Sequence, residues 1–333
     1  MRVLVLGATG FVGQRLVAQL RESGWATPVL AGRRPPANLP VGLEFRQVDT
    51  LDSNSLRRAL ADIDAVVNSV AGEGDSISRG ARLLVEAALE TSRPRIVHMS
   101  SMAVYGRQEG QLREDASLDP GASWYARAKC EAEEHMAAYA AAGQRVIMLR
   151  PGCIHGPGSD MWVRQIARLL AAGRVGDLGP AGEGWSNLVH VDDVCSAVLL
   201  ALRHESAIEG PAIFNLAGAD SPQWNRYFID LGKAIGVAPV KSIRTLQLKL
   251  DASVGTALIR VLQRLTDKAG ADSQRLPVAL SPSFLRLWQQ ALRIDVEHAH
   301  TQLKFAPRTY SQSLAESAQW ALSQGIGSAR VSK

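Results

Sequence analysis

Short apolar runs alternate with amphipathic stretches through the first half of the sequence. Five runs have the length and β-branched content of buried strands, and apolar residues recur at helical spacing between them. The predicted strands are residues 2–6, 27–31, 43–48, 64–69 and 95–99. The predicted helices run from the glycines to Ser23, from Ser53 to Ala61, from Ser76 or Ser78 to Leu89, and from Ser123 to Ala142. The alternation predicts an α/β fold with a doubly wound parallel sheet and right-handed crossovers.

The first strand ends in a glycine-rich turn that opens the first helix. Its glycines allow a tight turn, a close approach of the backbone to a ligand, and packing of helix on strand. The free N–H groups at the helix start then face an anion, most simply the pyrophosphate of a dinucleotide. The spacing differs from the general G-x-G-x-x-G fingerprint, so an ordinary glycine-rich loop is the alternative, which the βαβ context disfavours. The predicted cofactor contacts here are Gly7, Thr9, Gly10, Phe11, Val12 and Gly13.

The second predicted strand ends at two arginines, Arg33 and Arg34. An acid about 20 residues past the glycines would hold the adenosine ribose of NAD, but no acid occurs between positions 22 and 44. Two guanidiniums can instead pair with a 2′-phosphate. The sequence therefore favours NADP over NAD, with a solvated arginine pair before a proline loop as the alternative.

Two further strand ends are candidates for cofactor contacts, because ligands of open α/β sheets bind at the carboxyl ends of the strands. Asp49 follows the third strand, where it either accepts from the adenine amino group or merely ends a surface strand. Val70 and Ala71 follow the fourth.

The loop and helix after the fifth strand carry the candidate chemistry. Tyr125 and Lys129 are four residues apart on the predicted helix and therefore share one face. A phenol has an unperturbed pKa near 10, and a nearby ammonium, helped by an oxidised nicotinamide, is expected to lower it toward the working range. Tyr125 would then exchange a proton with a substrate oxygen, to which Ser101 could also hydrogen-bond. The alternative is a half-buried tyrosine and a solvated lysine without a catalytic role.

Composition narrows the function classes. The 333 residues are 46% hydrophobic and 21% charged, which suits a compact protein of one large or two modest domains. No apolar run reaches the roughly 18 residues that a membrane span needs, and we read no targeting segment. The net charge of +5 comes from scattered arginines, so nucleic-acid binding is not expected. Three widely spaced cysteines form no metal or redox motif and fit a reducing cytoplasm.

Taken together, the motifs resemble those of the extended short-chain dehydrogenases/reductases, the NAD(P)-dependent epimerase/dehydratase group. The segments that carry the resemblance are Gly7-x-x-Gly10-x-x-Gly13, Ser100-Ser101-x-x-Val104-Tyr105-Gly106, Tyr125-x-x-x-Lys129, Arg150-Pro151-Gly152 and His190-Val191-Asp192-Asp193-Val194. It covers about residues 1–220, and the C-terminal third matches loosely.

The resemblance implies specific roles for individual residues. Ser101, Tyr125 and Lys129 would be the catalytic triad, with Lys129 also holding the nicotinamide ribose. The residues expected beside the nicotinamide are Pro151, Gly152, Cys153 and Ile154. For Cys153 we favour an apolar wall position over a nucleophile, and for His190 an orienting hydrogen bond over catalysis.

The predicted architecture has two parts. Residues 1–150, joined again by 186–217, would form a Rossmann-type NAD(P)-binding domain, and residues 151–185 and 218–333 a smaller, mainly helical substrate-binding lobe. Helices are expected at 161–172, 191–202, 222–235, 246–265, 282–292 and 314–322, short strands at 185–189 and 212–216, and a linker at 267–274. The tryptophans of the lobe are expected in its core; any that line a cleft would favour a hydrophobic ketone or alcohol. By resemblance, helices 78–89 and 125–142 would form the seam of a homodimer.

The triad supports reversible hydride transfer between an alcohol and a carbonyl of a small-molecule substrate. Similar dehydratases carry an Asp-Glu pair where this chain has Met102-Ala103, so dehydration is disfavoured. A nucleotide-sugar epimerase remains the runner-up, with Arg164, Arg168, Arg174 or Arg226 available to hold a diphosphate. A non-catalytic NADP-binding redox sensor is a third hypothesis, which an intact Ser-Tyr-Lys set disfavours.

Overall fold

The computed structural model describes residues 1–36, 39, 41–205, 210–256, 259 and 278–327. By its internal contacts the chain divides into two compact units. The first unit comprises Met1–Gly152, Val189–Ala217 and Ile294–Pro307. The second unit comprises Cys153–Leu188, Gly218–Arg293 and Arg308–Lys333.

The first unit is built on one sheet, which has seven strands among the described residues, all paired in parallel in the order β10-β7-β5-β4-β1-β2-β3. The strands are β1 (Arg2–Leu6), β2 (Thr27–Gly32), β3 (Glu44–Gln47), β4 (Ala65–Asn68), β5 (Arg95–Met99), β7 (Val146–Pro151) and β10 (Ala212–Leu216). Short apolar runs form these strands because both faces of the sheet are covered.

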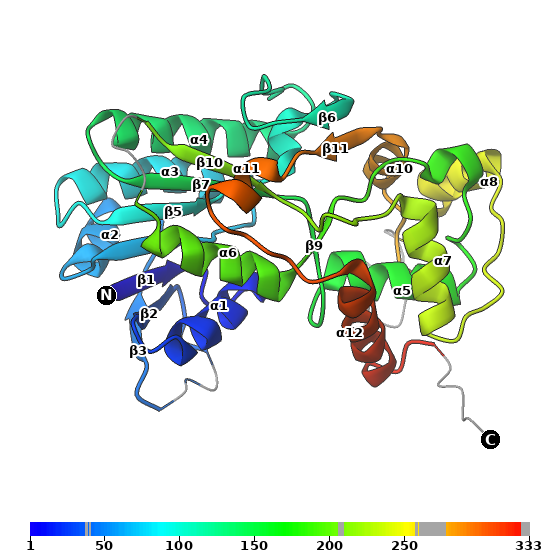
Figure 1. Cartoon of the computed structure of the whole chain (residues 1–333), viewed down its shortest axis with the longest axis horizontal. Helices are drawn as coiled ribbons and strands as arrows, with labels where there is room; N and C mark the ends of the chain where they lie inside the picture. The colour runs from blue at the N-terminus through cyan, green and yellow to red at the C-terminus, as the bar shows by residue number, and fades with distance from the viewer. Residues whose placement is uncertain (37–38, 40, 206–209, 257–258, 260–277, 328–333) are drawn as a thin grey trace. The chain divides into compact units, whose positions relative to one another are not determined.

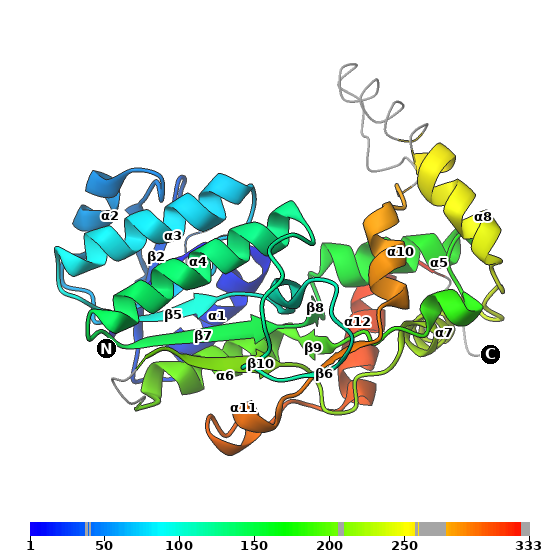
Figure 2. The same ribbon diagram turned by 90° about the horizontal axis from the view of Figure 1, so that it is seen from above.

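Helices cover both faces of this sheet. In Figures 1 and 2, α2 (Ser53–Leu60), α3 (Gly74–Leu89) and α4 (Trp124–Ala141) lie on one face, and α1 (Phe11–Glu22) and α6 (Val191–Arg203) on the other. Buried side chains of the first three helices share one hydrophobic cluster with β1, β2, β4 and β5, including Leu84, Met136 and Val66. The unit also contains the 3-10 helix η1 (Met102–Tyr105), β6 (Gly110–Leu112) and α11 (Glu297–Thr301). The doubly wound parallel sheet predicted from the sequence is confirmed.

The second unit is mainly helical. Among its described residues, the elements are β8 (Cys153–His155), the π-helix η2 (Asp160–Gln165), α5 (Ile166–Ala171), the 3-10 helix η3 (Gly179–Gly182), α7 (Trp224–Ala234), α8 (Thr245–Leu250), the π-helix η4 (Asp251–Gly255), α10 (Pro282–Gln289) and α12 (Tyr310–Ser323). Two strands, β9 (Leu188–His190) and β11 (Leu292–Ile294), stand where the chain passes between the units. Trp224, Phe228 and Trp288 are fully buried and pack ring against ring, as expected for core residues.

Several predicted boundaries need correction. Helix α2 begins at Ser53 as predicted but ends at Leu60, and it is capped by Asp52, whose carboxylate accepts from the N–H of Asn54. Helix α3 begins at Gly74, before Ser76 or Ser78. The helix expected at 161–172 is the π-helix η2 followed by α5, because the turns of η2 are wider than those of an α-helix. The helix expected at 246–265 is described only as α8 and η4, and the linker 267–274 lies outside the described residues.

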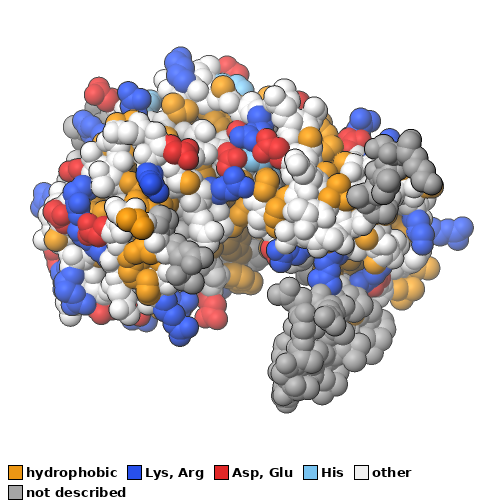
Figure 3. Space-filling view, turned by 90° about the horizontal axis from the view of Figure 1, so that it is seen from below, with side chains coloured by type: hydrophobic (Ala, Val, Ile, Leu, Met, Phe, Trp, Pro, Cys, Tyr) orange, Lys and Arg blue, Asp and Glu red, His pale blue; other side chains and the backbone are white. Residues whose placement is uncertain are grey.

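The surface is mixed in charge. On the face drawn in Figure 3, Lys and Arg side chains are interspersed with Asp and Glu side chains. No helix in the described part of the chain has the length and apolar character that a membrane span requires.

Candidate active site

The glycine turn has the shape that the sequence predicts for a cofactor cradle. Gly7 has φ +85°, and a Cβ there would lie 2.9 Å from the carbonyl oxygen of Ser69. A Cβ on Gly13 would lie 2.1 Å from the carbonyl oxygen of Gly7, so only glycine allows α1 to pack this closely. No side chain caps α1 at Gly10. Its first-turn amides and its dipole therefore fit the pyrophosphate of a dinucleotide.

The two arginines follow a strand that neighbours this turn. Strands β1 and β2 are paired with Leu6 opposite Ala31, so Arg33 and Arg34 leave the sheet at the same edge as the glycines. Both side chains are exposed, and within the described ranges neither has a hydrogen bond or ion pair. Both guanidiniums thus have their donors available to an anionic ligand.

Other predicted cofactor contacts also follow strands at this edge. Asp49 is exposed. One of its carboxylate oxygens accepts from the N–H of Leu51 (2.9 Å), and the other oxygen takes no part in that bond. Val70 is half-buried and donates its N–H to Oδ1 of Asn68 (3.3 Å), whereas Ala71 is exposed.

The residues after β7 fall on both sides of the unit boundary. Pro151 ends β7, and the N–H of Gly152 donates to the carbonyl oxygen of Leu216 (2.9 Å). Cys153 and Ile154 belong to the second unit. Burial raises the pKa of the Cys153 thiol, so it is no thiolate nucleophile at neutral pH.

The candidate triad comes together in the first unit. Ser101 follows β5 and begins η1, where its Oγ accepts from the N–H of Ala103 (3.2 Å). The Ser101 side chain lies near enough to the Tyr125 phenol to lower its pKa as a hydrogen-bonding neighbour. Lys129, one turn further along α4, is 3% exposed; its Nζ donates to the carbonyl oxygen of Met99 (2.6 Å) and lies 5.9 Å from the centre of the Tyr125 ring. The three side chains therefore converge at the carboxyl end of β5.

Burial sets the pKa values of this group. It raises the pKa of Tyr125 above its ordinary value, and the hydrogen bond with Ser101 offsets the rise only in part. It also lowers the pKa of Lys129 to about 8, against the opposing charge of Glu133. The expectation that Lys129 lowers the tyrosine pKa is therefore wrong for the residues of this chain alone, because burial raises the pKa of Tyr125 and Ser101 is the neighbour that opposes the rise.

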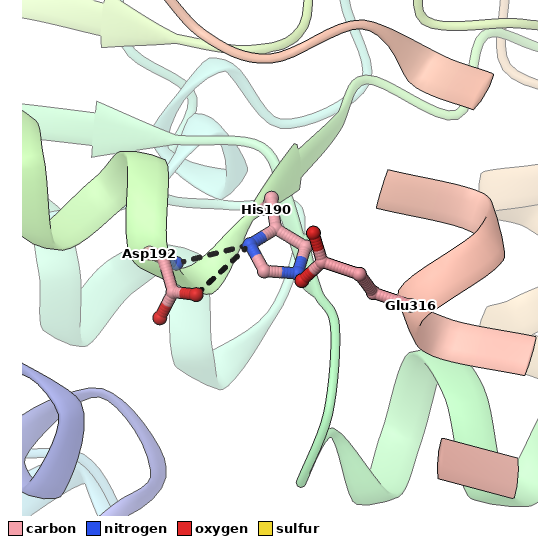
Figure 4. Close-up of side chains that lie close together, drawn as sticks. All are labelled: His190, Asp192 and Glu316. Atoms are coloured by element: carbon pink, nitrogen blue, oxygen red, sulfur yellow. Dashed lines mark hydrogen bonds and ion pairs between the residues drawn. The ribbon is translucent and has the colours of Figure 1, made fainter. Parts of the chain in front are cut away.

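His190 has the orienting role that the sequence analysis favours. It ends β9 and caps α6, and its Nδ1 accepts from the N–H of Asp192 (3.2 Å), a pair visible in Figure 4. Asp192 lies in the first turn of that helix. The capping bond occupies the ring nitrogen that faces the helix, so the contact is one of helix start and not of proton transfer.

Three of the four arginines proposed to hold a diphosphate are paired within the second unit. Arg164 lies 3.3 Å from Asp160, Arg174 lies 2.6 Å from Asp251, and Arg226 lies 2.6 Å from Asp230. Arg168 also has an interaction partner. These guanidiniums are already engaged by this chain's own groups.

A buried polar network beside the triad was not predicted from the sequence. It joins Glu133 of α4 to Arg150 of β7, to Ser100 just after β5, to Tyr105 of η1 and to Asn215 of β10. The signal available in the sequence was the position of Glu133, four residues beyond Lys129 on the same helix face.

The fold and the site define a Rossmann-type enzyme that binds a nicotinamide dinucleotide. A sequence profile of the NAD dependent epimerase/dehydratase family matches residues 3–217, and the chain belongs to this family as an NAD(P)-dependent oxidoreductase-type enzyme. The predicted resemblance is confirmed.

Relatives within the family carry out different reactions. The chain is 30% identical to 3-diazoavenalumate denitrifying reductase of a Streptomyces species, over 84% of this chain and 95% of the relative. It is 24% identical to N-acetyl-alpha-D-glucosaminyl-diphospho-ditrans,octacis-undecaprenol 4-epimerase of Escherichia coli O157:H7, over 96% and 94%. Among solved structures, MoeE5 in complex with UDP-glucose and NAD matches with a TM-score of 0.71 and 26% identity, over 97% of this chain and 99% of that one.

Proposed function

We propose that this chain is an NADP-dependent reductase or dehydrogenase that moves hydride between the cofactor and a carbonyl or alcohol substrate. The observation that carries the proposal is the convergence of Tyr125, its neighbour Ser101 and the buried Lys129, whose Nζ lies 5.9 Å from the centre of the Tyr125 ring. The first unit would serve as the cofactor domain and the second as the substrate lobe, with Ile294–Pro307, which the sequence assigned to the lobe, in the first unit.

In the proposed mechanism, Tyr125 is the acid that protonates the carbonyl oxygen of the substrate. Ser101 donates a second hydrogen bond to that oxygen and orients it. A nicotinamide held here would supply the hydride for reduction or accept it for oxidation. Lys129 keeps a positive charge next to the phenolate that Tyr125 becomes, and holds the nicotinamide ribose.

The pKa directions favour reduction near neutral pH. A phenol whose pKa is raised carries its proton at neutral pH, as a proton donor must. A lysine with a pKa of about 8 is mostly charged there. The reverse reaction, which needs the phenolate, gains from higher pH until Lys129 loses its proton.

Support for NADP comes from Arg33 and Arg34. They are exposed at the edge of the sheet where the glycine turn lies, with their donors available. A 2′-phosphate offers them charge-assisted, bidentate hydrogen bonds. NAD remains the alternative cofactor, because MoeE5 is a structural neighbour with NAD bound.

Nucleotide-sugar epimerisation is the second candidate, favoured by the likeness to MoeE5 with UDP-glucose and to the E. coli 4-epimerase. A diphosphate needs cationic groups, and Arg164, Arg174 and Arg226 are already paired with acids. The 30% identity to a reductase over most of both chains supports reduction instead.

A substrate screen separates the two. Purified protein is given NADPH with a panel of ketones and aldehydes, and separately NAD⁺ or NADP⁺ with UDP-glucose or UDP-N-acetylglucosamine. The absorbance of the reduced cofactor and the sugar products are followed. The proposal predicts stoichiometric consumption of NADPH with at least one carbonyl compound. Interconversion of a UDP-sugar without net cofactor consumption would contradict it and establish the epimerase.

A further inference from the structure

A carboxylate with no assigned role lies on the helix face that carries Tyr125 and Lys129. Glu133 is one turn beyond Lys129 and is 4% exposed. Its partner Arg150, on β7, is 2% exposed. The guanidinium binds it in a bidentate manner, Nε donating to Oε1 (2.9 Å) and Nη2 to Oε2 (2.7 Å). A buried, bidentate ion pair fixes both the distance and the orientation of the two elements that it joins.

The partners of this ion pair flank the proposed triad. Ser100, which immediately precedes Ser101, donates its hydroxyl to Oε1 of Glu133. Arg150 donates through Nη1 to the hydroxyl of Tyr105 (2.9 Å), at the end of the 3-10 helix that Ser101 begins. The network therefore ties the residues on both sides of Ser101 to the helix that carries the other two triad members.

The network continues to the neighbouring strand. The hydroxyl of Tyr105 donates to Oδ1 of Asn215 on β10 (2.7 Å), and Nη1 of Arg150 also donates to the carbonyl oxygen of Glu114 (2.9 Å). Because the polar groups satisfy one another in a water-poor interior, the arrangement has few alternative geometries.

We propose that Glu133 is a positioning residue: clamped by Arg150, its carboxylate holds Lys129 and Tyr125 in register with Ser101 and keeps a negative charge beside the lysine. This inference rests on the proposed function. Glu133 acts through the triad and touches no substrate.

The charges around Lys129 decide the pH dependence. On its own helix it faces Tyr125 and Glu133, and from β5 it faces His98, whose pKa burial holds well below its ordinary value, so that the imidazole is neutral. Arg150 lies behind Glu133 on β7. Burial lowers the pKa of Lys129 to about 8 and Glu133 opposes that shift, so removing the carboxylate moves the pKa lower still.

The test is a comparison of two adjacent glutamates of α4. Glu133→Gln removes the buried carboxylate, and Glu134→Gln removes an exposed one as the matched control. For NADPH-dependent reduction we expect Glu133→Gln to lower kcat by about 10- to 100-fold, as misplaced catalytic groups do. Burial lowers the pKa of Lys129 to about 8, so we expect kcat to fall on the alkaline side as Lys129 loses its proton. In Glu133→Gln this fall should move to lower pH by about one unit, the smallest shift typical of a close charge. Glu134→Gln should match the wild type in both.

Controls separate positioning from folding. The double variant Glu133→Gln/Arg150→Met removes both charges, leaves no unpaired buried cation and serves if the single variant does not fold. Wild-type kcat and pH profile in a folded Glu133 variant would overturn the proposal. The proposal would also be overturned if the activity of the variant fell only in proportion to its folded fraction, with the alkaline fall of kcat at the wild-type pH. Tyr125→Phe is measured alongside: full activity there defeats the proposed function, whereas an inactive Tyr125→Phe with an unaffected Glu133→Gln defeats only the positioning role.

Discussion

The pKa values of Tyr125 and Lys129 shift in opposite directions for one reason. Burial penalises charge of either sign, so the pKa of the phenol rises and the pKa of the ammonium falls toward about 8. The two pKa values therefore move apart, and near neutral pH the pair holds a neutral phenol beside a cation, the protonation state of a general acid with a stabilised conjugate base. The direction of these shifts depends on how deeply the two side chains are buried. Their four-residue spacing in the sequence does not predict that depth.

The cofactor preference is a prediction at the same scale. Replacing Arg33 or Arg34 by Ala should raise the Kd of NADPH about 10- to 100-fold, since hydrogen bonds between charged groups contribute roughly 1.5–3 kcal/mol each. The Kd of NADH should stay unchanged. Arg21→Ala, which removes an exposed charge from the last turn of α1, is the matched control. Fluorescence titration of both cofactors measures the effect, and an unaltered NADPH affinity in both variants would contradict NADP selection by this pair.

At the scale of elements, helix α4 shows what its sequence specifies. Ser123 caps it, and its side chain accepts from the N–H of Ala126 (3.0 Å), as the predicted helix start requires. Ser123→Ala should lower the free energy of unfolding by about 1 kcal/mol, the usual value of a lost cap. Ser78→Ala, within α3, should stay within about 0.5 kcal/mol of the wild type. Chemical denaturation measures the free energy of unfolding of both variants. Equal values for Ser123→Ala and Ser78→Ala would contradict the capping role of Ser123.

Prediction of the elements succeeded where a local pattern decides them. The apolar runs of β1, β5 and β10 have the predicted bounds, because turn residues or polar groups end each run. Strand β7 was missed although its run of apolar residues could have revealed it. The three-residue strands β6 and β8 and the π-helices have no comparable local signal, because distant pairing or wider turns define them.

At the scale of the whole molecule, the segment Ile294–Pro307 joins the first unit from far along the chain. Two contacts on β10 hold it there: the ring of Phe214 lies 4.8 Å from that of His298, and Nδ2 of Asn215 donates to the carbonyl oxygen of Asp295 (3.1 Å). The periodicity of apolar residues along the sequence does not predict such long-range contacts. The same limit hid the pairing of Glu133 with Arg150, since it depends on α4 lying against β7.

The central claim is that Tyr125 passes a proton to substrate while hydride moves from the cofactor. The direct measurement is the steady-state rate of NADPH-dependent carbonyl reduction by Tyr125→Phe, with NADPH binding measured on the same preparation. The account predicts a kcat lower by about 100- to 10,000-fold, the typical contribution of a general acid, with NADPH affinity preserved. A variant that binds NADPH and reduces the substrate at the wild-type rate would contradict it.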